Sequence, residues 1–148
     1  MKIVFVCTGN SCRSVIAEYL LNKMAKDRGL NWEARSCGTA AERYFPTPDG
    51  VKTSLAQRGI TDIRHTPQLA GRELLGWADL VLPMTRGHRN HLLDEYPEFT
   101  DKTHLFSEYC SDETADIADP IGQPTAVYQK CRDEIEKALT SLLEKHAS

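Results

Sequence analysis

The chain has 148 residues, of which 41% are hydrophobic and 26% are charged, and its formal net charge at pH 7 is −3. This length suits one core, so we expect a single domain over residues 1–148. The sequence has no basic block, which argues against nucleic acid and membranes as partners, and its apolar runs are too short for a membrane span or signal peptide. We therefore expect a cytoplasmic protein whose five cysteines are thiols.

The first half of the chain alternates strand and helix patterns. Residues 2–7 form a β-branched apolar run typical of a buried strand, and residues 15–30 carry apolar side chains at four-residue steps, as in a helix. Residues 31–36 predict a second strand, and residues 48–59 predict a helix that begins near a proline and ends at a glycine.

The second half continues the alternation. We predict a short helix, a strand, a helix and a strand at residues 69–78, 79–84, 86–96 and 102–107. A long final helix over residues 126–146 has an apolar face that comprises Val127, Cys131, Ile135, Leu139 and Leu142. This order predicts an α/β fold, with a doubly wound parallel sheet of about four strands flanked by helices on both faces. Ligands of such sheets bind beyond the carboxyl ends of the strands, where residues 7–14 lie.

Residues 7–14, with the sequence CTGNSCRS, form the turn between the first strand and the first helix. Gly9 and Asn10 tolerate positive φ, which lets backbone N–H groups point inward as a nest for an anion. Arg13 adds a planar fork that can hold two oxygens of that anion. The same positive surroundings favour the thiolate form of Cys7, so a nucleophile would face a bound tetrahedral anion.

Other interpretations of this turn fit less well. An unreactive buried Cys7 would leave the glycine, the asparagine and Arg13 unexplained, and a nucleotide-binding loop would end in Gly-Lys-Ser/Thr. Four residues separate Cys7 from Cys12, whereas zinc sites favour two, so we expect no metal. The remaining alternative to an enzyme is a silent module that binds phosphate or a phosphorylated partner. We interpret four histidines without ligand spacing as surface or loop residues: His65, His88, His91 and His104.

Cys7 and Arg13-Ser14, five residues apart at the start of a chain of this length, resemble the low-molecular-weight protein-tyrosine-phosphatase family. The stretches ARSCG, ADLVLPM and DIADP are similar to that family's second strand, central strand and late acidic loop. The resemblance implies a single α/β domain without a cofactor, with phosphate or another oxyanion in the loop and a phosphorylated protein as substrate. Its members act on phosphotyrosine or, in a bacterial branch, on phosphoarginine, and some are thioredoxin-coupled arsenate reductases.

The family pattern assigns Cys7 as the nucleophile and Asp119 as the general acid, which later serves as the base for the attacking water. On spacing alone, Asp119 is equally well interpreted as a turn residue, because Pro120 follows it and Asp112 and Asp116 lie nearby.

The family's phosphate-binding loop corresponds here to Thr8, Gly9, Asn10, Ser11, Cys12 and Ser14, with Arg13 as a catalytic residue. By the resemblance, Asn10 fixes the loop, and Ser14 stabilises the Cys7 thiolate or caps the following helix. Cys12 can trap an oxidised Cys7 as a protective disulfide, or it is only a small residue.

The substrate is less clearly indicated. Phosphotyrosine members usually have an aromatic residue where Ile121 stands and a bulky aliphatic residue in place of Ser11, whereas the phosphoarginine branch has threonine there. We predict phosphotyrosine or phosphoarginine as substrate, with a slight preference for phosphoarginine. The expected substrate wall comprises Ala40, Tyr44, Phe45 and Ile121, although Tyr44 and Phe45 could instead anchor their loop.

Arsenate reductase is the alternative function, because many members with that activity share this loop sequence. They pass the oxidation to a cysteine pair after the central strand. Here that stretch contains Met84 and no cysteine, and neither Cys110 nor Cys131 is placed as a paired shuttle. We therefore expect a phosphatase.

Overall fold

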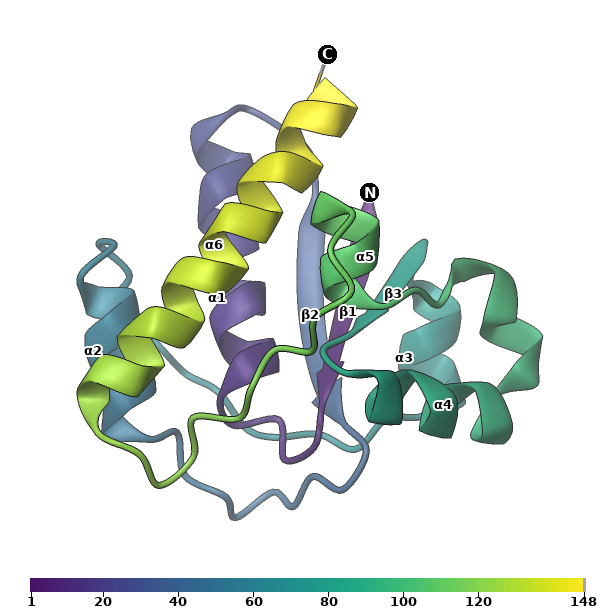
Figure 1. The fold of residues 1–148 in the computed structure, drawn as a ribbon, viewed down its shortest axis with the longest axis horizontal. Helices are drawn as coiled ribbons and strands as arrows, with labels where there is room; N and C mark the ends of the chain where they lie inside the picture. The colour runs from purple at the N-terminus through teal and green to yellow at the C-terminus, as the bar shows by residue number, and fades with distance from the viewer. Residues whose placement is uncertain (148) are drawn as a thin grey trace.

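Three parallel strands form the central sheet, in the order β2-β1-β3 (Figure 1). They are β1 (Lys2–Cys7), β2 (Glu33–Gly38) and β3 (Leu80–Pro83), in a computed structural model that describes residues 1–147. Val6 pairs with Cys37 on one side and with Pro83 on the other. The carboxyl ends of the three strands are therefore level with one another, and Cys7 is the last residue of the middle strand.

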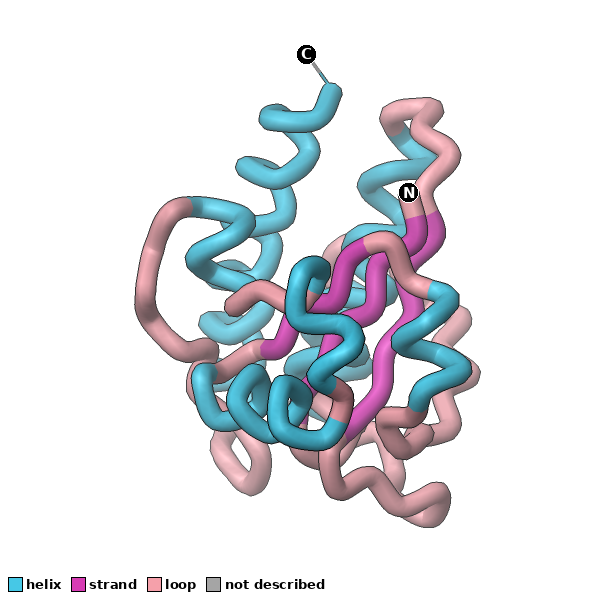
Figure 2. The backbone as a smooth tube through the Cα atoms, turned by 90° about the vertical axis from the view of Figure 1, so that its right-hand side faces the viewer, coloured by secondary structure: helices cyan, strands magenta, loops and turns pink. Residues whose placement is uncertain are grey.

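Helices cover both faces of the sheet (Figure 2). One face carries α1 (Arg13–Asp27), α5 (Phe106–Ser111) and α6 (Thr125–Ala147), with α2 (Asp49–Ala56) packed against α1 and α6. The other face carries α3 (Arg72–Trp77) and α4 (Arg86–Glu95), followed by a 3-10 turn, η1 (Pro97–Lys102). Alternate side chains of β1 serve the two cores, because successive residues of a strand point to opposite faces. Ile3 and Phe5 join the core under α1 and α6, and Val4 and Val6 join the core under α3 and α4.

The predicted α/β fold with a doubly wound parallel sheet is confirmed, but the prediction of a fourth strand over residues 102–107 is wrong. Only Thr103 forms a bridge, with Val81, and the chain turns into α5 at Phe106. The turn buries Phe106 and Cys110 on one face of that helix, and the Phe106 ring packs edge-on against Phe5 at 5.9 Å between centroids. Burial of the Phe106 side chain stabilises this core.

The apolar face predicted for the last helix is shifted at its start. Val127 is 38% exposed, whereas the neighbouring Tyr128 is buried. The Tyr128 ring lies flat against Gly50 of α2, where an added Cβ would come within 2.3 Å of the ring. The absence of a side chain at Gly50 therefore selects Tyr128 as the contact between α2 and α6.

Candidate active site

The loop between Cys7 and α1 lies at the carboxyl end of the middle strand. The chain that follows β2 supports it, because Thr39 N donates to Cys7 O and Ala40 N donates to Thr8 O, each at 2.9 Å. Gly38 makes this approach possible. A Cβ at Gly38 would lie 2.3 Å from Thr8 O, a distance that no packed structure allows.

Asn10 is the fixed point of the loop. Its φ of +54° lies in the left-handed region, which asparagine tolerates better than most side chains. Its side-chain nitrogen donates to Ser14 Oγ and to Ser36 Oγ, both at 2.9 Å, and its Oδ1 accepts from Gln68 N at 3.0 Å. His65 Nε2 contacts Asn10 O at 2.7 Å. Every polar group of this buried side chain is therefore satisfied, which holds the unusual backbone conformation.

A chain of hydrogen bonds leads from Glu18 to Cys7. The Ser36 hydroxyl donates to Glu18 Oε1 at 2.6 Å, so Ser36 Oγ accepts from Asn10. Ser14 Oγ accepts the second N–H of Asn10 and lies 2.9 Å from Cys7 Sγ. Because that oxygen is already an acceptor, its own hydrogen is available to the sulfur. The hydroxyl can therefore donate to a Cys7 thiolate.

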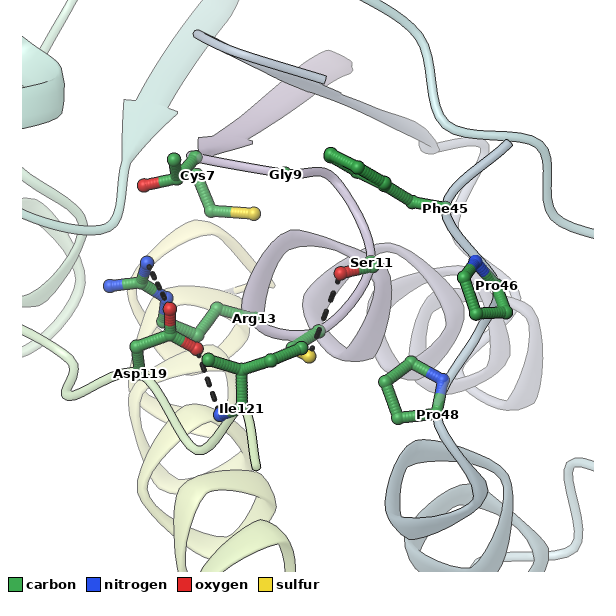
Figure 3. Close-up of a pocket in the computed structure, with 11 residues that line it drawn as sticks. Cys7, Gly9, Ser11, Arg13, Phe45, Pro46, Pro48, Asp119 and Ile121 are labelled. Carbon is green, nitrogen blue, oxygen red and sulfur yellow. Dashed lines mark hydrogen bonds and ion pairs between the residues drawn. The ribbon is translucent and has the colours of Figure 1, made fainter. Parts of the chain in front are cut away.

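Arg13 and Asp119 come together from opposite ends of the chain (Figure 3). Arg13 Nη2 lies 3.5 Å from Asp119 Oδ2, and Arg13 Nη1 donates to Ile117 O at 2.9 Å. The Arg13 side chain is buried, and its Nε has no hydrogen-bond partner within residues 1–147. The Asp119 side chain is 43% exposed and accepts from Ile121 N at 3.0 Å.

A pocket of about 360 Å³ opens above the loop (Figure 3). Of the predicted site residues, those that line it are Cys7, Thr8, Gly9, Ser11, Cys12, Arg13, Phe45, Asp119 and Ile121. Phe45 packs over Gly9, where an added Cβ would lie 3.5 Å from its ring. Tyr44, expected in the wall, is 79% exposed and packs edge-on against Phe45, and Ala40 supports the loop through its backbone.

Several contributors were missed by sequence reasoning. Pro46 and Pro48 line the pocket beside Phe45. His65 lies in a loop, as expected, but its Nε2 also contacts the Asn10 carbonyl. The interpretation of His88 as a surface or loop residue is wrong, because His88 is buried on α4 and places Nε2 2.8 Å from Thr8 Oγ1. No sequence spacing links these histidines to the loop, since the contacts join segments far apart in the chain.

Burial shifts the pKa of two groups beside the phosphate-binding loop, His88 and Cys12. It lowers the pKa of His88 to about 4, with help from the Arg13 charge and against the charges of Asp116 and Asp119. Burial raises the pKa of Cys12 to about 11, which the Asp119 charge reinforces and a hydrogen bond with Ser11 opposes. At neutral pH His88 is therefore uncharged and Cys12 is a thiol. Within residues 1–147, no three histidine, cysteine or acidic side chains are grouped to hold a metal ion, and no helix is long and apolar enough to cross a bilayer.

A cysteine at the end of a central strand, an arginine at the start of the next helix and a carboxylate beside that arginine define a cysteine-dependent phosphatase. The sequence model for the low molecular weight phosphotyrosine protein phosphatases matches residues 2–147. The chain belongs to that family.

Relatives within the family carry different names. The chain is 39% identical to the protein-arginine-phosphatase of Geobacillus stearothermophilus, over 97% of this chain and 95% of that one. A structure of the YwlE arginine phosphatase, in a mutant with a phosphorylated active-site serine, superposes with a TM-score of 0.95 at 33% identity, covering 100% of this chain and 97% of that one. The chain is also 32% identical to arsenate reductase 1 of Bacillus cereus, over 90% of this chain and 87% of that one.

Proposed function

We propose that this phosphatase removes phosphate from arginine side chains of proteins. The observation that carries the proposal is the Ser11 hydroxyl, which lines the pocket 3.7 Å from the Cys12 sulfur. A small hydroxyl residue leaves room for the guanidine group of phosphoarginine and can hydrogen-bond one of its nitrogens. The similarity to named protein-arginine-phosphatases supports the same substrate.

In the first step the Cys7 sulfur attacks phosphorus, and the bond between phosphorus and the guanidine nitrogen breaks. Arg13 and the loop N–H groups hold the phosphate oxygens, and the buried Arg13 Nε gains an acceptor that the protein does not supply within residues 1–147. Asp119, protonated at this stage, gives its proton to the departing nitrogen, so that the arginine leaves as a guanidinium. The product is a phosphocysteine on Cys7.

In the second step water attacks the phosphocysteine. The Asp119 carboxylate, formed in the first step, takes a proton from the water as its oxygen bonds to phosphorus. The bond between phosphorus and sulfur breaks, phosphate is released, and the sulfur leaves as a thiolate to which the Ser14 hydroxyl donates. The site thereby returns to its starting protonation state. We also infer that the protein works in the cytoplasm, because all five cysteines are free thiols and the mechanism needs one of them reduced.

The proposal is tested with two peptides of one sequence that carry either phosphoarginine or phosphotyrosine. We expect kcat/KM for the phosphoarginine peptide to be about tenfold higher or more, since one well-placed hydrogen bond is worth such a factor. Ser11→Ile should lower the phosphoarginine rate selectively, and Ser11→Thr, the matched control, should keep it. A faster reaction with phosphotyrosine in the unaltered protein would reverse the substrate assignment.

A second experiment tests whether the reaction passes through a phosphocysteine. Rapid acid quenching should yield protein phosphorylated on Cys7, detected by mass spectrometry. Cys7→Ser should abolish turnover of a small aryl phosphate, because a hydroxyl is a far poorer nucleophile than a thiolate. Undiminished turnover in Cys7→Ser would exclude the phosphocysteine mechanism, and binding without phosphate release in the unaltered protein would favour the silent module.

A further inference from the structure

The first turn of α4 contacts both halves of the active site. Arg86 N, an N–H group that the helix itself leaves unpaired, donates to Asp116 Oδ1 at 2.9 Å. Two residues further along, His88 Nε2 lies 2.8 Å from the Thr8 hydroxyl of the phosphate-binding loop. The first turn of α4 therefore hydrogen-bonds both to the loop that follows Cys7 and to the segment that leads to Asp119.

The segment that leads to Asp119, residues 113–118, is held in place mainly through hydrogen bonds of its backbone. Ile117 N donates to Met84 O at 3.1 Å, and Ile117 O accepts from Arg13 Nη1 at 2.9 Å. The Arg86 guanidinium donates to Thr114 O. Among the hydrogen bonds named here, the one between Asp116 and Arg86 N is the one in which the segment uses a side chain.

The position of Asp119 depends on these hydrogen bonds of the preceding segment, because its own carboxylate makes few contacts. Its side chain is 43% exposed, and it contacts only Ile121 N and, at 3.5 Å, Arg13 within residues 1–147. A general acid must lie within hydrogen-bond reach of the leaving atom, and a displacement of about 1 Å is costly. A change at Asp116, three residues away, can therefore reach the proton donor through the backbone.

We propose that Asp116 is a positioning residue for Asp119, and that it acts by capping the N-terminus of α4. The inference rests on the proposed function, in which Asp119 protonates the leaving group. An anionic cap on a helix N-terminus is favourable, so the Asp116 carboxylate stabilises the start of α4. The same hydrogen bond fixes the position of the segment that leads to Asp119. Asp116 itself does not line the pocket.

The experiment compares two aryl phosphates that differ in their need for a proton. Phenol leaves poorly without protonation, whereas 4-nitrophenol leaves well as its anion. We expect Asp116→Ala to lower kcat/KM about tenfold for phenyl phosphate and less than about threefold for 4-nitrophenyl phosphate, as partial loss of a general acid should. Asp116→Asn, whose side-chain oxygen can still accept from Arg86 N, should restore most of the phenyl phosphate rate.

Two further variants serve as controls for this comparison. Glu113→Ala removes an exposed carboxylate from the same segment, one that makes no side-chain hydrogen bond or ion pair within residues 1–147, so the rates with both substrates should be unaffected. Asp119→Ala should show the same substrate selectivity as Asp116→Ala, but more strongly. In the double variant, the Asp116 change should cost nothing further with phenyl phosphate, since it acts through Asp119.

The outcomes separate this inference from the proposed function. If Asp119→Ala shows no selectivity between the two phosphates, the assignment of the acid fails. If Asp119→Ala is selective but Asp116→Ala lowers both rates equally, or neither, then only the positioning role is overturned. Should Asp116→Ala not fold, Arg86→Pro tests the same link, because it removes the N–H that donates to Asp116 at a first helical position, where proline is tolerated. Arg86→Ala, which keeps this N–H and removes only the Thr114 contact, is its matched control. Arg86→Pro should lower the phenyl phosphate rate selectively relative to Arg86→Ala, and an equal loss with both substrates would overturn the proposal.

Discussion

The Ser14 hydroxyl lies 2.9 Å from the Cys7 sulfur, at the end of a chain of hydrogen bonds that begins at Glu18, and it can donate to a Cys7 thiolate. Ser14→Ala removes this donor without opening the pocket, since Ser14 is fully buried. A hydrogen bond to a charged group is worth about 1.5–3 kcal/mol, so we expect kcat/KM for an aryl phosphate to fall by roughly ten- to a hundredfold.

The same variant should react more slowly with iodoacetamide at neutral pH, because the thiolate is the reactive form. Unfolding in urea provides the control for a general structural defect. An unchanged alkylation rate together with slower turnover would mean that Ser14 acts on a later step than formation of the thiolate.

Local patterns predicted the parts of this molecule that depend on short stretches of chain. The apolar run of β1, the periodicity of α1 and the residues of the loop after Cys7 are all local, and the structure has these elements where they were expected. The Asp119-Pro120 step could be named from the family pattern, although its distance from Arg13 in the fold could not.

Features that depend on distant segments were missed. Where a fourth strand was predicted, the chain enters α5, and Phe106 of that helix packs on Phe5, a residue about a hundred positions earlier in the chain. Similarly, His88 reads as an exposed helical residue until α4 is packed beside Thr8, and Tyr128 is buried in place of Val127 only because α2 offers Gly50. These outcomes are set by tertiary contacts, which override local preference.

Gly38→Ala should damage the active site without touching any catalytic group. The added Cβ would meet Thr8 O at 2.3 Å and Asn10 N at 2.9 Å, and both are backbone atoms that cannot rotate away. We expect a loss of about 1–3 kcal/mol in the free energy of unfolding, as in other overpacked sites. Phosphate should also inhibit the variant more weakly, because the loop that would bind it is displaced.

Gly71→Ala is the matched control for this prediction. Gly71 precedes α3 in an extended conformation with φ of −157°, and an added Cβ there would have no atom within 4 Å. Both unfolding and phosphate inhibition should be unchanged. Equal behaviour of the two alanine variants would show that the loop moves aside at no cost.

His88 should make the protein less stable in mild acid. Its pKa is about 4 in the folded protein and 6.5 for the ordinary side chain, so between these pH values the unfolded chain binds a proton that the folded chain does not. Stability from this group is therefore complete above about pH 6.5 and is lost as the pH falls towards 4, by up to about 3 kcal/mol. The Arg13 and His91 charges strengthen the effect, while Asp116 and Asp119 weaken it.

The measurement is the free energy of unfolding in urea as a function of pH. His88→Gln, which keeps a group able to contact Thr8, should show a shallower loss between pH 6.5 and 4 than the unaltered protein. His91→Gln changes an exposed histidine on the same helix and should keep most of the slope. Identical slopes for the unaltered protein and His88→Gln would show that His88 protonates equally well in the folded state.

The last prediction concerns arsenate, because an arsenate reductase is among the relatives of this chain. Reduction of arsenate at Cys7 requires two electrons, which such a mechanism draws from a pair of thiols that ends as a disulfide open to thioredoxin. Here Met84 follows β3 and is fully buried, and a thioether cannot form a disulfide. The later cysteines, Cys110 and Cys131, are buried too, and burial raises the pKa of each to about 12, which leaves them as unreactive thiols at neutral pH.

Protein supplied with thioredoxin, its reductase, NADPH and arsenate should therefore consume no more NADPH than a Cys7→Ser control, while the unaltered protein still hydrolyses an aryl phosphate. Sustained arsenate-dependent oxidation of NADPH that needs Cys7 would instead establish a reductase, and would require Cys12 or one of the buried cysteines to complete the relay.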